Sequence, residues 1–150
     1  MTQQRDCRMC QDPIIQQREY KHPHKVTELE VSTAVLRPTH QYFRGYTLLT
    51  LRQHANELWE LDQETRRKFI EEANQVALAV AKSFKPIKMN YCLLGNNDPM
   101  AHLHWHLIPR RLTDPNPKRP IWAAPFPEVS LSDDAFVQIA DEIRRNLYHG

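Results

Sequence analysis

Three histidines stand at alternate positions of one short segment, and apolar residues lie between them: His102, Leu103, His104, Trp105, His106 and Leu107. In a β-strand, successive side chains point to opposite faces, so this alternation places the imidazoles on one face and the apolar residues on the other. Neighbouring imidazoles are then ~6.5–7 Å apart, the rise of two strand residues. The pattern predicts a strand at about 101–108 that presents a row of imidazoles and seals its other face against a core.

Three functions are compatible with such a row. One is a solvated strand face that is rich in histidine. Another is a metal site, because imidazole is the commonest metal ligand, although the following LIPRRLTDP lacks the Glu and Gly expected after a cupin-type pair. The third is nucleophilic catalysis at phosphorus, in which a neutral imidazole attacks while neighbouring imidazoles hydrogen-bond its other nitrogen or the phosphate oxygens.

The cysteines offer a second chemistry. Cys7 and Cys10 form a Cys-x-x-Cys pair, which is typical of a redox motif, of half a zinc site, or of a surface coincidence. No βαβ pattern surrounds the pair, which disfavours the redox function. Tetrahedral zinc needs two more ligands, typically imidazoles. Cys92 stands alone in an apolar strand and is predicted to be a buried core residue.

Composition excludes several classes of protein. The 150 residues predict a single domain, 1–150, and a net charge of +2 gives no reason to expect nucleic acid or membrane as a partner. The N-terminus has no signal-like apolar stretch, so we expect a cytoplasmic location. With glycine only at positions 45, 95 and 150, neither a P-loop nor a G-x-G-x-x-G turn can be built. Any phosphate must be bound in another way.

The elements that must position these residues predict an α+β fold with an antiparallel sheet, one long helix and a C-terminal helix. Asp62 is the expected N-cap of the long helix, which ends before Pro86, and Ser132 is the expected cap of the last helix. The proline-rich residues 109–129 are predicted to be an extended surface segment. The other predicted elements are strands at 26–36, 46–52, 88–95 and 101–108 and a short helix at 54–61.

The His-x-His-x-His motif with its apolar flanks resembles the signature of the histidine triad superfamily of nucleotidyl hydrolases and transferases. FRGYTLLTLRQHANELWEL resembles the family's first hairpin strand and the helix after it, and MNYCLLGNN followed by HLHWHLIPRRLTDP is similar to the diadenosine-polyphosphate hydrolase branch. The resemblance covers roughly residues 35–122. It implies a HIT-like fold, a homodimer and a small-molecule nucleotide substrate, cleaved at its α-phosphate, with room for Mg²⁺ bound to that nucleotide.

The resemblance also implies roles for single residues. The family's nucleophile is the middle histidine, here His104, while His106 is expected to donate a hydrogen bond to a phosphate oxygen and His102 to orient the site. Asn96 and Asn97 are expected to contact phosphate or ribose, although asparagine is also ordinary in a turn.

A zinc-binding subset of the superfamily uses a Cys-x-x-Cys pair, a histidine after the second strand and the first triad histidine. These positions are Cys7, Cys10, His54 and His102. The resemblance therefore implies a structural Zn²⁺ that ties an N-terminal zinc-binding segment, 1–25, to the triad strand, and His102 is then not a free imidazole. His22 and His24 are alternative donors, because they are closer to the cysteines in sequence.

Two departures from the family concern substrate binding. Relatives carry Gly-Gln or Gly-Ser before the triad where this chain has NNDPMA, and no acidic or amide residue for the ribose hydroxyls stands near Arg37–Pro38. Two alternatives to hydrolysis also stay open. The same scaffold can perform phosphorolysis, and a catalytically weak member can act as a nucleotide-binding regulatory module.

Overall fold

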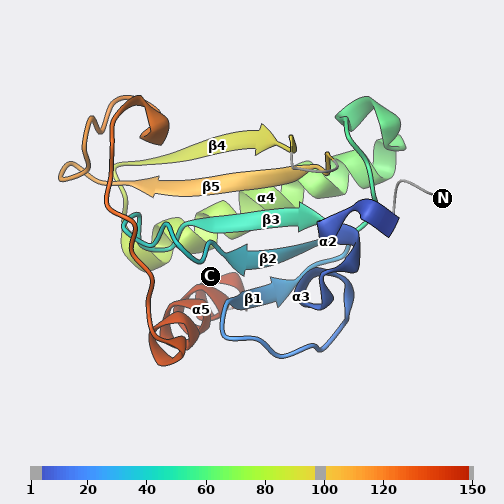
Figure 1. Ribbon diagram of the computed structural model, residues 1–150, viewed down its shortest axis with the longest axis horizontal. Coiled ribbons are helices and arrows are strands. Elements are labelled where there is room, and N and C mark those ends of the chain that lie inside the picture. Colours follow the sequence, from blue (N-terminus) through green and yellow to red (C-terminus); the bar gives the residue numbers. More distant parts are fainter. Residues whose placement is uncertain (1–4, 97–100, 149–150) are drawn as a thin grey trace.

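An antiparallel sheet with a long helix along one face forms the centre of the fold (Figure 1), as seen in a computed structural model that describes residues 5–96 and 101–148. Within these residues the sheet has five strands in the order β1-β2-β3-β5-β4. The strands are β1 (Lys25–Glu28), β2 (Ser32–Leu36), β3 (Thr47–Leu51), β4 (Lys88–Leu94) and β5 (His104–Arg110). The helical elements are α2 (Arg8–Gln11), α3 (Pro13–Gln16), η1 (Leu58–Glu60), α4 (Gln63–Phe84), η2 (Ile121–Ala123) and α5 (Asp133–Tyr148). The predicted α+β fold is confirmed.

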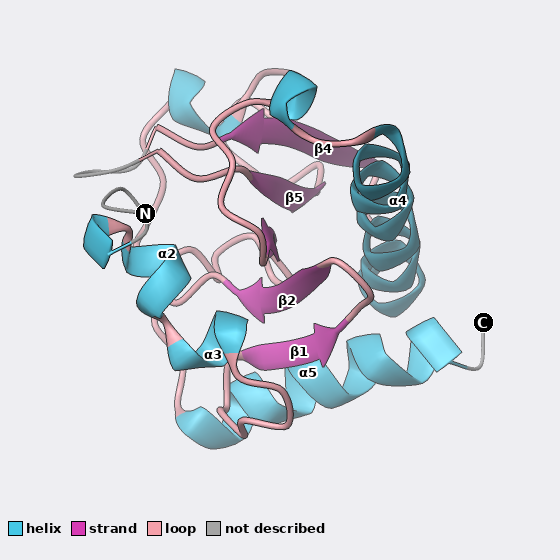
Figure 2. Cartoon of the chain, turned by 90° about the vertical axis from the view of Figure 1, so that its right-hand side faces the viewer, coloured by secondary structure: helices cyan, strands magenta, loops and turns pink. Residues whose placement is uncertain are grey.

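Helix α4 lies along one face of the sheet (Figure 2) and buries an apolar stripe against it: Phe69, Ala73, Val76, Ala77 and Val80. Asp62 caps the helix, since its side chain accepts a hydrogen bond from the Thr65 N–H at 2.9 Å, and Lys85 ends it in a left-handed conformation before Pro86. Both predicted ends are confirmed. No helix within the described residues is long and apolar enough to cross a membrane.

Helix α5 packs against α4 and against strand β1 at one edge of the sheet (Figure 2). The Ser132 hydroxyl accepts a hydrogen bond from the Ala135 N–H at 3.2 Å, which confirms the predicted cap. Phe136, Ile139 and Ile143 are buried in the core shared with α4.

The strand register separates two faces of the sheet. Leu49 lies opposite Trp105, and both pack in the core beneath α4. Leu48 lies opposite His106 and Thr50 opposite His104, so these side chains point to the other face, because residues directly opposite in a ladder share a face. The alternation of imidazole and apolar side chains along β5 is therefore confirmed for His104 and His106.

Strand β5 begins at His104, three residues later than predicted, so the first triad histidine precedes the strand. His102 is held by its own main chain, because its N–H donates to the Gly95 carbonyl at 2.8 Å and the Leu103 N–H donates to the Ala55 carbonyl at 2.9 Å. A side chain at Gly95 would bring a Cβ within 2.9 Å of the His102 carbonyl oxygen, so this close approach requires glycine.

Two other local predictions were wrong, and a third was right only in part. Residues 26–36 form two antiparallel strands, because the buried Glu72 carboxylate of α4 accepts hydrogen bonds from the Val31 N–H (3.0 Å) and the Ser32 hydroxyl and holds the turn between them. The short helix predicted at 54–61 is present as the 3₁₀ helix η1, which covers only Leu58–Glu60. Cys92 is half-buried on β4 and not a core residue.

The loop between β2 and β3 is fixed from inside by Gln41. The buried Gln41 amide donates to the carbonyls of Arg37 (2.9 Å) and Tyr46 (3.0 Å), and its oxygen accepts from the Gly45 N–H at 3.0 Å. Gly45 has φ +95°, and a Cβ there would lie 2.5 Å from the Phe84 ring, so only glycine fits. The loop therefore holds Arg37 and Tyr46 rigidly at the edge of the triad face.

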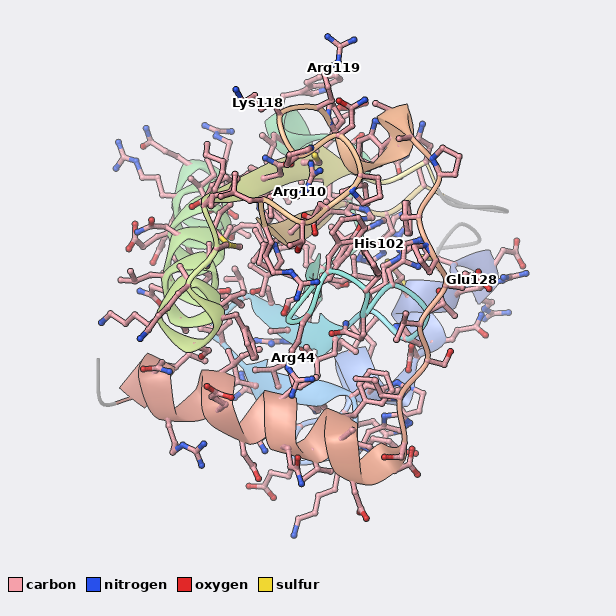
Figure 3. All side chains as sticks on the ribbon, turned by 90° about the vertical axis from the view of Figure 1, so that its left-hand side faces the viewer. Arg44, His102, Arg110, Lys118, Arg119 and Glu128 are labelled. Atoms are coloured by element: carbon pink, nitrogen blue, oxygen red, sulfur yellow. The ribbon has the colours of Figure 1, made fainter. Side chains whose placement is uncertain are left out.

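The proline-rich segment after β5 is anchored by Arg110, which is fully buried and stacks over Phe43 at 5.4 Å. Figure 3 shows Arg110 beneath the stretch that carries Lys118 and Arg119. Its guanidinium donates to Asp114 Oδ2 (3.1 Å), Asn90 Oδ1 (3.0 Å), the Asn116 carbonyl (3.2 Å) and the Arg119 carbonyl. A buried cation with this many acceptors pins the segment to the end of β4 and β5.

Candidate active site and metal centre

His102 connects two groups of side chains. Its Nε2 lies 2.6 Å from the Leu51 carbonyl oxygen, which can only accept, so the ring proton is on Nε2. The Nδ1 lone pair then points toward two thiols, with Cys7 Sγ at 3.3 Å and Cys10 Sγ at 3.5 Å. His54 joins them, since its Nδ1 lies 3.3 Å from Cys10 Sγ. The main chain thus fixes the tautomer in which His102 presents a free nitrogen to the cysteines.

These side chains form a candidate metal site, whose four ligand atoms all lie within 4.8 Å of one another: Cys7 Sγ, Cys10 Sγ, His54 Nδ1 and His102 Nδ1. A tetrahedral ion with bonds of about 2.3 Å to sulfur and 2.0–2.1 Å to nitrogen has S···N edges of ~3.6 Å, close to the distances found here. Burial and the neighbouring Cys7 raise the pKa of the Cys10 thiol to about 12, so a cation is needed to hold the thiolate form. The donor set fits a metal.

His22 and His24, the alternative donors, lie elsewhere. Their rings contact each other at 4.7 Å, and His24 packs on Phe136 of α5 at 4.0 Å. The imidazoles of the candidate metal site are those of His54 and His102.

His104 is the histidine with a free nucleophilic nitrogen. Its Nδ1 lies 2.9 Å from the His102 carbonyl oxygen, so Nδ1 carries the ring proton and Nε2 carries a lone pair. The residue is only 4% exposed, and burial lowers its pKa below the usual range, with Arg37 acting in the same direction. At neutral pH the ring is therefore a neutral imidazole whose reactive nitrogen is Nε2.

His106 stands beside His104 on the same face, with ring centroids 4.8 Å apart. Its Nδ1 forms a hydrogen bond of 2.6 Å with the Tyr46 hydroxyl. Burial lowers the pKa of His106 to about 3, helped by His104, Arg37 and His40, and burial raises the pKa of Tyr46 to about 12. Both groups are neutral at pH 7. With the Tyr46 hydroxyl as donor, the single ring proton of His106 is on Nε2 and can be donated to a ligand oxygen.

Of the two asparagines, only Asn96 lies within the described residues. It is exposed and lines a pocket of ≈ 440 Å³ with Trp59 and Leu94, and the triad histidines are not among the residues that line this pocket. Asn97 lies outside the described residues. Their contact with phosphate or ribose stays a prediction.

A groove of ≈ 870 Å³ also lies between β1 and α5, lined by Lys25, Glu28 and Arg144 among others. Two of its cations are already paired, because Lys25 contacts Glu28 and Arg144 binds Asp141 and the β1 carbonyls. The groove contains no nucleophile with an orienting partner, so the triad face is the better candidate for chemistry.

Sequence reasoning missed three residues that shape the site: Arg37, Gln41 and Tyr46. Each is placed by hydrogen bonds across the β2–β3 loop, and no local sequence motif indicates that these residues belong to the site. The one available signal was Gly45, since a lone glycine before an apolar strand marks a constrained turn.

A buried pair of oriented imidazoles on an antiparallel sheet fits the histidine triad resemblance, and the Cys₂His₂ cluster beside it fits the zinc-binding subset. The profile of the HIT domain matches residues 14–113, and the chain therefore belongs to the HIT family. It is 27% identical over 109 residues to "Protein hit" of Bacillus subtilis (strain 168), covering 69% of this chain and 68% of that protein.

Two solved structures give the same assignment of fold. A histidine triad protein from Bradyrhizobium japonicum superposes with a TM-score of 0.69 at 26% identity, covering 83% of this chain and 90% of that one. A Zn-bound histidine triad family protein from Mycobacterium smegmatis has a TM-score of 0.65 at 18% identity, covering 97% and 96%. The family and its neighbours support a HIT protein of the nucleotide-binding or hydrolase type.

The lowered pKa of His106 predicts a specific dependence of stability on pH. The pKa of His106 is 6.5 in the unfolded chain and about 3 in the folded protein, so between these values only the unfolded chain is protonated at this residue. The free energy of unfolding should therefore fall as pH drops through this window, by up to ~1.4 kcal/mol per pH unit from this residue. Urea unfolding between pH 6 and 4 should show a shallower fall for His106→Asn than for the wild type. Equal slopes would show that His106 titrates normally in the folded protein.

Proposed function

We propose that this protein is a nucleotidyl hydrolase or transferase that acts at the α-phosphorus of a nucleotide ester, anhydride or phosphoramidate, such as a dinucleoside polyphosphate. The observation that carries the proposal is the hydrogen bond from His104 Nδ1–H to the His102 carbonyl at 2.9 Å, which leaves Nε2 as a free nucleophile. A solvated histidine face would not bury both rings, and a metal site on His104 would need Nε2 to meet a second ligand.

In the first step, the Nε2 lone pair of His104 attacks the α-phosphorus in line. The bond from phosphorus to the leaving oxygen or nitrogen breaks, and the leaving group takes the electron pair. The His102 carbonyl stabilises the positive charge that develops on the His104 ring, because it accepts the Nδ1–H bond. His106, held by Tyr46, donates its Nε2–H to a non-bridging phosphate oxygen.

In the second step, water or another acceptor attacks the phosphorus of the nucleotidyl-histidine from the side that the first leaving group vacated, opposite His104. The bond between phosphorus and Nε2 breaks, the pair of electrons returns to His104, and the nucleophile loses a proton to solvent or product. Water gives hydrolysis, while phosphate as acceptor gives phosphorolysis with the same residues.

The metal in the Cys₂His₂ cluster is proposed to be zinc. Two thiols and two imidazoles in a closed tetrahedral arrangement are the donor set that zinc prefers in structural sites. The cluster joins the N-terminal segment to the residue whose carbonyl orients His104, so its function is to hold His102 in place. We expect the protein in the cytoplasm, where reducing conditions would keep both thiols available for the metal. Cell fractionation would test this location. Mg²⁺ is expected only as a companion of the nucleotide.

A homodimer is also part of the proposal. Strand β4 is an edge of the sheet, and its unpaired side presents main-chain donors and acceptors to a second strand. Exposed apolar side chains lie on β4 and on the adjoining helix, with Tyr91 at 48%, Leu94 at 38% and Leu78 at 52% exposed. A second copy that continues the sheet would cover both.

The three histidines should differ in their effect on turnover. His104→Ala removes the atom that forms the covalent bond and should lower kcat for diadenosine tetraphosphate by about three orders of magnitude or more, with nucleotide binding retained. His106→Ala should cost roughly 10²–10³, the effect of removing one oriented donor. Steady-state release of mononucleotide measures both. Rapid acid quench should trap a nucleotidyl adduct on His104, and an adduct elsewhere would contradict the mechanism. Binding without turnover would identify a regulatory module.

Zinc should be present at about one ion per chain by elemental analysis. Cys7→Ser and His54→Ala should each lower that content and reduce the Tm by at least ~5 °C, because metal binding is coupled to folding. Cys92→Ser is the matched control, since this thiol is outside the cluster, and it should keep full occupancy. A Cys7→Ser variant that keeps both its zinc and the wild-type Tm would exclude this site.

The native mass by light scattering should be near twice 17.8 kDa. Tyr91→Glu and Leu78→Glu place charges on the β4 edge and on α4, and they should shift the protein to a monomer at micromolar concentration. Val137→Glu on α5 is the control, because Val137 is 40% exposed but lies at the other edge of the sheet. A monomeric wild type would contradict the proposal.

A further inference from the structure

Arg37 reaches the triad face from a different strand. Val35 lies opposite Leu48, and Leu48 lies opposite His106, so the three side chains share one face of the sheet. Arg37 follows Val35 by two residues and continues the ladder, because its N–H donates to the Tyr46 carbonyl at 3.0 Å. Side chains alternate along an extended chain, which places Arg37 on the same face as His106.

The guanidinium of Arg37 lacks an acidic partner within the described residues. It lies over the Tyr46 ring at 5.7 Å, and its buried Nε forms no hydrogen bond there. None of the ion pairs formed within residues 5–96 and 101–148 includes it. By contrast, each guanidinium nitrogen of the buried Arg110 donates a hydrogen bond. A buried donor on an unpaired cation is the arrangement expected where an anion binds.

The field of Arg37 acts on the residues that would surround a phosphate. It contributes to lowering the pKa of His104, His106 and His40, in each case after burial. The His40 ring lies 5.9 Å from Tyr46 and 5.2 Å from Phe126, so it closes the same corner of the face.

The acidic group that acts on this corner is Glu128, whose charge partly opposes the lowering of the His40 pKa by burial and Arg37. Glu128 is exposed, and Figure 3 shows it on the chain that runs from η2 to α5 on the side away from α4. It acts on neither triad histidine nor Tyr46, so the positive charge beside the triad is not neutralised from this side.

We propose that Arg37, with His40 beside it, is an anion subsite for the phosphate that follows the α-phosphate, so that the substrates are nucleotide anhydrides with a phosphate leaving group. This inference rests on the proposed function and narrows its substrate class. In a buried setting a guanidinium binds phosphate oxygens through two parallel charge-assisted hydrogen bonds. A leaving group without charge, such as ammonia from a phosphoramidate, makes no such bonds. Arg37 therefore discriminates between the two classes of substrate.

The test compares two substrates that share the adenylyl group, diadenosine tetraphosphate and adenosine 5′-phosphoramidate. Arg37→Gln should lower kcat/KM for the tetraphosphate roughly 10- to 100-fold, the effect of losing hydrogen bonds to a charged group, and change that for the phosphoramidate less than about threefold. Arg37→Lys should recover part of the loss, since it restores the charge without the paired donors. Equal losses on both substrates, or no loss, would overturn the subsite.

Arg44→Gln is the matched control. It removes the same charge from the same loop, but Arg44 is exposed and lies over Phe84 of α4 at 5.9 Å, away from the triad face. It should keep wild-type values for both substrates. Both Gln variants should keep the wild-type Tm, which separates an effect on the subsite from an effect on folding.

An equilibrium measurement distinguishes this inference from the proposed function. By calorimetry the wild type should bind ADP at least about tenfold more tightly than AMP, and Arg37→Gln should bring the two affinities together. Preference for ADP that depends on Arg37, in a protein that turns over nothing, would support the subsite and refute the hydrolase. Turnover through His104 with the same ADP preference in both proteins would refute the subsite alone.

Discussion

The hydrogen bond from His102 Nε2–H to the Leu51 carbonyl decides how the three histidines divide their tasks. It fixes the tautomer that turns Nδ1 toward the two thiols, so His102 belongs to the metal cluster. The same residue's carbonyl then accepts from His104 Nδ1–H, which frees Nε2 of His104. One main-chain acceptor on β3 therefore orients the proposed metal ligand directly and the proposed nucleophile through the carbonyl of His102. In this proposal the first histidine of the triad binds metal and the other two act on the substrate.

The β2–β3 loop is the second constraint. Gln41 bonds to both ends of the loop, and Gly45 supplies a backbone conformation that no other residue adopts without strain. The loop therefore restricts Tyr46 and Arg37, so that His106 and the proposed anion subsite are held in place before any substrate arrives. A site that is organised in advance loses less conformational entropy on binding, and its donors need no rearrangement in the transition state.

The fold and the chemistry of the site were predictable to different depths. The stripe on α4, the caps at Asp62 and Ser132 and the alternation along β5 are local patterns, and each was confirmed. The start of β5 was not predictable, because it depends on distant carbonyls of Gly95 and Ala55 that bond the chain before His104.

Long-range pairing also explains what was missed at the site. Arg37 and Tyr46 have no motif of their own. They acquire a role because the register of β2, β3 and β5 brings them beside His106, about 60 residues away in the chain. The metal ligands were the exception, since the family pattern names His54 and His102 although nothing in their spacing requires that they meet.

A chain without a glycine-rich loop can still bind phosphate, because its cations do not have to come from backbone amides. Burial keeps His104 and His106 neutral, so the imidazoles contribute a lone pair and a donor but no fixed charge. Arg37 adds a guanidinium cation at this face, which the imidazoles do not supply. The proposed nucleophile and donor thus come from strand β5, and the cation comes from the β2–β3 loop. A neutral nucleophile beside a fixed cation suits an anionic substrate, since the cation draws the phosphate in while the nucleophile keeps its lone pair.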